Sequence, residues 1–79
     1  MYELTINDSV VETKTPAEAV ELFHEGIIAE MVYEARLVCG LTGEVLADYQ
    51  FENPSSAKLY RSDRFRHIQK FGFDTVVIM

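Results

Sequence analysis

The sequence predicts a small α+β protein in which two helices cover one face of an antiparallel sheet. Two runs of alternating apolar and polar residues lie on either side of Gly40-Leu41-Thr42-Gly43, which is typical of a hairpin. Thr15-Pro16-Ala17-Glu18 is a strong helix start. A second helical segment follows the loop around Pro54.

Length and composition limit the kind of protein. Seventy-nine residues make one domain, 1–79, and a hydrophobic fraction of 48% excludes a disordered chain. No apolar run approaches the roughly 18 residues of a membrane span. No basic segment leads into an apolar one after Met1, so no secretory signal is visible and a cytoplasmic protein is expected. The single cysteine, Cys39, cannot form an internal disulfide.

The first strand is expected at Tyr2–Ile6, where apolar and polar residues alternate. Asn7-Asp8-Ser9 is a typical turn, because short polar side chains bond to their own backbone and tolerate the left-handed region. Val10–Glu12 then allows a short returning strand, although three residues give it little support. An extra N-terminal hairpin is therefore possible.

The first helix is expected to begin at the Thr15 capping box, with an apolar face and acidic residues opposite it. Gly26 is placed to end the helix in the left-handed conformation. The alternative is one continuous helix that passes Gly26 and reaches about Met31, at a cost of about 1 kcal/mol for the internal glycine.

The central hairpin occupies residues 31–52. Its period of two predicts one buried face, while the glycines supply the positive φ of a tight reversal. Cys39 falls on the buried face. Three apolar residues fall on the other face, where they either form the centre of an interface or lie under the helices: Val32, Val38 and Leu46.

The segment from Ala57 to Gly72 is predicted to be helical in two pieces that break near Ser62-Asp63, because one straight helix would mix arginines into the apolar face. In the second piece Phe65, Ile68 and Phe71 are expected to face the core, with Gly72 at the end. Phe73–Met79 is apolar on both faces and predicts a buried final strand.

With Val10–Glu12 set aside, the order of elements is βαββαβ. This order predicts a ferredoxin-like two-layer sandwich, with an antiparallel sheet and two helices on one face. The resemblance is one of element order alone, and such a fold carries many unrelated functions.

No pattern in the chain indicates catalysis. Glu21 and His24 have a spacing found in di-iron bundles, but no second copy exists, so His24 is expected to be a surface residue. The glycine loop lacks the lysine of a phosphate-binding loop. A nucleophilic Cys39 would need a nearby histidine, and it is expected to face inward. We therefore expect no enzyme, no cofactor and no metal site.

The charge is distributed unevenly. The net charge is -6, with -9 on residues 1–53 and +3 on residues 54–79. An acidic surface is expected on the first helix and the outer hairpin, with carboxylates spaced about 5 to 6 Å apart, close to the phosphate repeat of a nucleic acid: Glu18, Glu21, Glu25, Glu34, Glu44 and Asp48. A basic segment interleaved with aromatics is the second surface: Lys58, Tyr60, Arg61, Arg64, Arg66 and Lys70, with Phe65.

The main expectation is a non-enzymatic protein-binding module that acts through the acidic surface, as an adaptor or inhibitor of a larger partner or as a homodimer. In size and charge such a protein is similar to phage-encoded inhibitors of nucleic-acid machinery. The alternative is a nucleic-acid-binding module that uses the basic segment 58–70. Nothing indicates a membrane partner.

Overall fold

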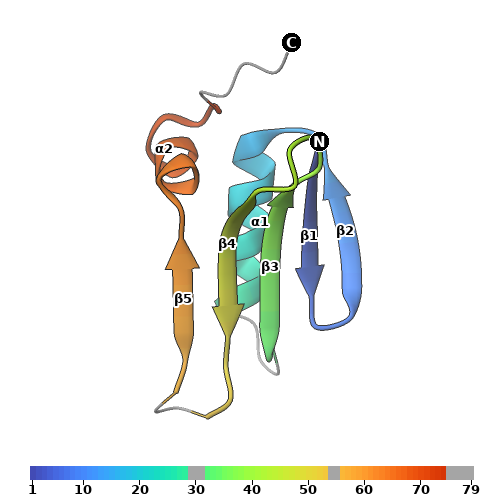
Figure 1. The fold of residues 1–79 in the computed structure, drawn as a ribbon, viewed down its shortest axis with the longest axis vertical. Helices are drawn as coiled ribbons and strands as arrows, with labels where there is room; N and C mark the ends of the chain where they lie inside the picture. Colours follow the sequence, from blue (N-terminus) through green and yellow to red (C-terminus); the bar gives the residue numbers. More distant parts are fainter. Residues whose placement is uncertain (29–31, 54–55, 75–79) are drawn as a thin grey trace.

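The computed structural model describes residues 1–28, 32–53 and 56–74. It shows a five-stranded antiparallel sheet in the order β2-β1-β3-β4-β5, with two helices (Figure 1). The elements are β1 (Tyr2–Ile6), β2 (Ser9–Thr13), α1 (Pro16–Ile28), β3 (Glu34–Cys39), β4 (Val45–Gln50), β5 (Lys58–Arg61) and α2 (Asp63–Phe71). The predicted α+β class is confirmed.

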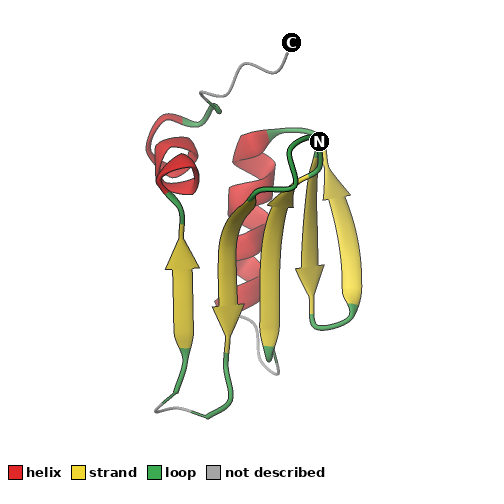
Figure 2. Ribbon diagram, viewed as in Figure 1, coloured by secondary structure: helices red, strands yellow, loops and turns green. Residues whose placement is uncertain are grey.

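α1 packs on one face of the sheet and α2 lies beyond the end of β5, so neither helix lies over the other face (Figure 2). α1 lies against β1 and β3, while α2 contacts α1 and β4. The rings of Phe23 and Phe65 meet edge to face with centroids 5.5 Å apart, which joins the two helices over the sheet. The core consists of Tyr2, Leu4, Ala19, Val20, Phe23, Ala35, Leu37, Cys39, Leu46, Ala47, Phe65 and Ile68.

The N-terminal hairpin forms as a regular element. β1 pairs with β2 from Tyr2 opposite Thr13 to Ile6 opposite Ser9, so the strand predicted at Val10–Glu12 is confirmed and extends by one residue at each end. Asn7 has a φ of 54°, as its place in the turn requires. Since β1 lies between β2 and β3, the order differs from a simple βαββαβ sandwich.

α1 begins as predicted but does not end at Gly26. The Thr15 hydroxyl accepts a hydrogen bond from the Glu18 amide at 3.2 Å, and the helix continues to Ile28. Gly26 is buried, and an added Cβ would lie 2.6 Å from Ile6 Cδ1. The glycine allows close approach of the helix to β1 and does not end it. The alternative of a continuous helix is correct as far as Ile28; Met31 lies outside the described residues.

The central hairpin is confirmed, with one irregularity. The register of β3 and β4 shifts between Leu37 and Val38, so that Leu37 lies opposite Ala47 and Val38 opposite Val45. The extra residue, Leu46, turns inward beside Ala47, and both are fully buried. The expectation that Leu46 faces outward is therefore wrong.

Residues 58–61 form a strand and not the predicted helical piece. β5 pairs with β4, with Tyr60 opposite Asp48 and Lys58 opposite Gln50. Without β5, β4 would be an edge strand with unpaired backbone groups, and pairing satisfies them. A four-residue segment gains little as an isolated helix, because helix nucleation is costly.

α2 follows its predicted signals except at its last turn. The Ser62 hydroxyl accepts a hydrogen bond from the Phe65 amide, and Gly72 ends the helix with a φ of 81°. Phe65 and Ile68 are buried as expected, whereas Phe71 is 53% exposed and does not belong to the core. The final strand predicted at Phe73–Met79 lies mostly outside the described residues. Its described part, Phe73 and Asp74, is not in a strand.

Candidate functional site

The side of the sheet opposite α1 is occupied by neither helix (Figure 2). Because side chains alternate along a strand, the cross-strand pairs identify the residues on this side. We call it the open face, and it consists of Glu3, Thr5, Val10, Glu12, Glu34, Arg36, Val38, Val45, Asp48, Gln50, Lys58 and Tyr60.

One row of the open face crosses all five strands, from Val10 through Thr5, Arg36 and Asp48 to Tyr60. Arg36 Nη2 and Asp48 Oδ2 are 3.3 Å apart and form an ion pair at its centre. Asp48 is the less exposed partner, with 23% of its side chain accessible. Its other oxygen, Oδ1, is buried and has no hydrogen-bond partner among the described residues.

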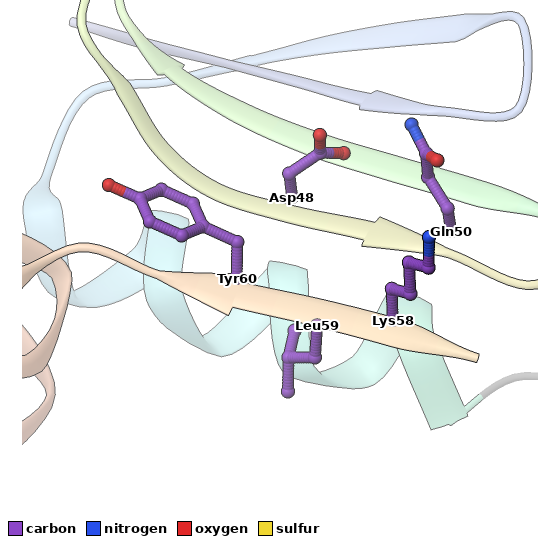
Figure 3. A pocket seen from close by; sticks show the side chains of 5 residues that line it. All are labelled: Asp48, Gln50, Lys58, Leu59 and Tyr60. Atoms are coloured by element: carbon purple, nitrogen blue, oxygen red, sulfur yellow. The ribbon is translucent and has the colours of Figure 1, made fainter. Parts of the chain in front are cut away.

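A shallow groove of about 230 Å³ lies along β4 and β5. Figure 3 shows Asp48, Gln50, Lys58 and Tyr60 on one side of these strands, while Leu59 points to the opposite side. Tyr60 is 53% exposed. The groove therefore combines an aromatic ring with a carboxylate, an amide and an ammonium group.

The structure does not gather the predicted acidic residues on one surface. Glu18, Glu21 and Glu25 are exposed on α1, on the helical side of the sheet. Glu34 and Asp48 belong to the open face, on the other side. Glu44 lies after the hairpin loop and binds Arg64, with 3.1 Å between the charged atoms.

The predicted basic segment is also divided. Lys58 and Tyr60 lie on the open face, whereas Arg61 pairs with Ala47 and so points to the helical side. Arg66 and Lys70 are exposed on α2. Arg64 is buried, with 7% of its side chain accessible, and is held by an ion cluster.

The ion cluster connects elements that are distant in sequence. Arg64 Nε donates to both Asp74 carboxylate oxygens, at 2.8 and 3.0 Å, and the Tyr2 hydroxyl donates to the same carboxylate. Arg64 Nη1 donates to Glu44, and Nη2 lies 3.5 Å from Cys39 Sγ. The cluster therefore joins β1, the end of β3, the hairpin loop, α2 and the segment after α2.

These contacts change three pKa values. The Asp74 carboxylate raises the pKa of Arg64, while burial and the bond to Asp74 raise the pKa of Tyr2 to about 12. Burial alone raises the pKa of the Cys39 thiol, but hydrogen bonds from Thr42, Leu41 and Arg64 outweigh it and lower the pKa to about 7. Cys39 is 1% exposed, so its thiolate contributes to the cluster and is not presented to a substrate.

The two histidines lie in packed surroundings. Gln69 Nε2 donates to His24 Nε2 at 2.6 Å, which links α2 to α1, and His24 is half-buried and not the expected surface residue. The His67 ring lies against Phe71 and Phe73, with centroids 4.7 and 5.1 Å away. In the described part of the chain, no group of three or more His, Cys, Asp or Glu side chains is arranged to hold a metal ion.

Sequence reasoning missed several members of the open face, among them Arg36, Val10 and Val45. That these residues share one face follows only from the register of β1, β2 and β3 and from the formation of β5 as a strand. Lys58–Arg61 shows no alternation of apolar and polar residues, so its own sequence carried little signal for the fifth strand. None of the helices in the described residues is long and apolar enough to cross a membrane.

No family model matches the chain, and neither the curated proteins nor the solved structures contain a significant match. Inference about function therefore depends on the chemistry of the surfaces described above.

Proposed function

We propose that this chain is a non-enzymatic protein-binding module, acting as an adaptor or inhibitor of a larger partner, and that the open face is its binding surface. The observation that carries the proposal is that a whole face of a five-stranded sheet is left uncovered by both helices. Exposed apolar side chains gathered on one face, here Val10 and Tyr60, are typical of an interaction surface.

The chemistry of the open face suits a protein better than a nucleic acid. Its four carboxylates are Glu3, Glu12, Glu34 and Asp48. Its two cations are Arg36 and Lys58, and its three valines are Val10, Val38 and Val45. Excess negative charge repels phosphates, whereas a mixture of signs beside apolar side chains permits a complementary protein surface.

Tyr60 and Arg36 are the expected anchors. Tyrosine and arginine are enriched among the residues that dominate binding energy, since each combines a large contact area with hydrogen bonding. Tyr60 projects beside the groove at one end of the cross-strand row, and Arg36 occupies the middle of that row (Figure 3). Both lie on strands, which hold them in place more firmly than a loop would.

The nucleic-acid alternative has weaker support. Its cations point in different directions, because Lys58 lies on the open face, Arg61 on the helical side and Arg64 in the ion cluster. Binding along a phosphate backbone requires a continuous basic path. The described residues of segment 58–70 offer only separated charges.

The test is capture of partners from a host lysate, run with and without nuclease, with the wild type and variants of each surface. We expect a captured protein that is reduced at least roughly tenfold by Tyr60→Ala or Arg36→Ala. Glu21→Gln with Glu25→Gln, on the exposed side of α1, is the matched control and should leave capture unchanged.

Two results would overturn the proposal. Loss of the partner through the α1 variants alone would assign binding to the acidic helix. Recovery of nucleic acid only, lost at higher salt and through Lys70→Glu, would favour the basic segment.

A further inference from the structure

β2 is an edge strand of the sheet formed by the described residues. It pairs with β1 on one side and with no other strand in the described structure on the other. Its residues Val10 and Val11 are 61% and 44% exposed. An exposed edge with β-branched side chains is a ready template for another strand.

The hydrogen bonds around β1 identify which groups of β2 are free. The Asn7 amide donates to the Glu34 carbonyl at 2.7 Å, and the Gly40 amide donates to the Met1 carbonyl at 3.0 Å. The backbone N–H and C=O groups of successive residues point to opposite sides of a strand. Odd-numbered residues of β1 therefore bond to β3, and even-numbered residues bond to β2. On β2 this pairing occupies Ser9, Val11 and Thr13.

It follows that Val10 and Glu12 direct their N–H and C=O groups to the free edge. A second β2 strand can form hydrogen bonds with Val10 and Glu12 only in a register that places its own Val10 or Glu12 directly opposite one of them. For two identical antiparallel strands there are three such registers: Val10 opposite the partner's Glu12, Val10 opposite the partner's Val10, or Glu12 opposite the partner's Glu12.

We propose that β2 pairs with β2 of a second copy of this chain, in the register that places Val10 opposite the partner's Glu12. The two-fold axis that relates the two copies then passes between Val11 and the partner's Val11, which lie opposite one another. Two hydrogen bonds form on each side of that axis. The result is a dimer with one continuous ten-stranded sheet.

Charge selects this register over the other two. It places Asp8 opposite the partner's Lys14, and symmetry repeats the pair. The register centred on Val10 would place Asp8 opposite the partner's Glu12, and the register centred on Glu12 would place two glutamates together. Like charges directly opposite one another destabilise a strand pair.

The other edge of the sheet is unsuited to self-pairing. The Ser62 amide donates to the Leu46 carbonyl at 2.9 Å, so the outward residues of β5 are Leu59 and Arg61. The charged residues of β5 are Lys58 and Arg61, both positive, which is a common way to protect an edge from pairing. Contact between β2 and β5 of another copy would join unlike surfaces and give open-ended assemblies.

This dimer does not depend on the proposed function, since β2 can pair whether or not the open face binds a partner. It does place the two open faces side by side on the same side of the joined sheet, so a partner with two sites would bind with higher avidity. Failure of the capture experiment and failure of dimerisation are separate outcomes.

Sedimentation over a wide concentration range tests the dimer. Val10→Pro removes only an outward N–H from β2 and should raise the dimer dissociation constant roughly 30-fold, since two hydrogen bonds are lost per dimer. Val10→Thr keeps the N–H and is the matched control. Lys14→Asp should also weaken the dimer, and adding Asp8→Lys should restore it.

A disulfide tests the register. Val11→Cys should cross-link with itself under oxidation, because the two Cα atoms would be about 4.5 Å apart. Ser9→Cys should not, and the wild type controls for the buried Cys39. A wild-type chain that remains monomeric throughout, a series of larger species, or preferential cross-linking of Ser9→Cys would each refute the proposal.

Discussion

Replacing Arg64 by methionine should severely destabilise the protein. Arg64 and Asp74 expose only 7% and 9% of their side chains, and the guanidinium donates to both carboxylate oxygens. Methionine fills much of the same volume but leaves the Asp74 carboxylate buried without its counter-ion. Such a charge is costly because water cannot solvate it.

The expected loss is large compared with the total stability. Removing one partner of a buried ion pair costs about 3–5 kcal/mol. A domain of this length has a free energy of unfolding of about 4–12 kcal/mol, from about 0.05–0.15 kcal/mol per residue. Arg64→Met should therefore lose about a quarter or more of the stability, and at the lower limit a substantial fraction of the molecules should be unfolded.

Urea unfolding followed by circular dichroism measures the effect. Arg66→Met, which changes an exposed arginine of the same helix, is the control and should cost less than about 0.5 kcal/mol. Arg64→Met combined with Asp74→Leu should recover much of the loss, because no buried charge is left unpaired and Glu44 is accessible to water. Equal stabilities for Arg64→Met and Arg66→Met would refute the reasoning.

Three further predictions concern pH and the ends of α2. The pKa of the Cys39 thiol is lowered from 9.0 to about 7, so the stability that its ionised form contributes is complete above pH 9 and is lost as the pH falls through about 7. The free energy of unfolding should therefore rise between pH 7 and pH 9, and Cys39→Ala should flatten this rise. The Tyr2 pKa is raised from 10.0 to about 12, so stability should fall as the pH rises through this range, and Tyr2→Phe should reduce the fall. Ser62→Ala removes the cap of α2 and Gly72→Ala strains a φ of 81°; each should cost about 1 kcal/mol in urea unfolding, and a change below about 0.3 kcal/mol would contradict these assignments.

Elements defined by local signals were predictable from the sequence. The capping residue Thr15 marks the start of α1, and Ser62 with Gly72 delimits α2. The alternation in β1, β3 and β4 likewise gave the correct strands. These signals lie within a few residues of the feature that they specify, so no knowledge of distant contacts was needed.

Features that depend on distant contacts were not predictable in the same way. Gly26 resembles a helix end until its contact with Ile6 is known. Segment 58–61 becomes a strand because β4 offers it an unpaired edge. The inward turn of Leu46 results from a one-residue shift between two strands, which periodicity alone does not reveal.

The candidate site was predictable only in part. Asp48, Lys58 and Tyr60 were named, but within two different surfaces. Their proximity follows from the pairing of β4 with β5. Arg64 was assigned to a solvent-facing basic segment, since its bonds to Tyr2, Glu44 and Asp74 span too much sequence for a periodic pattern to indicate.

The contact between Tyr2 and Asp74 limits how early the ion cluster can form during synthesis of the chain. The hydroxyl that donates and the carboxylate that accepts are 72 residues apart. Because translation proceeds from the N-terminus, the hairpins and α1 are made before Asp74, when Arg64 has only Glu44 as a counter-ion. The bonds that join Tyr2 and Arg64 to Asp74 can form only when Asp74 has left the ribosome, so this link between the first strand and the segment after α2 is made late in synthesis.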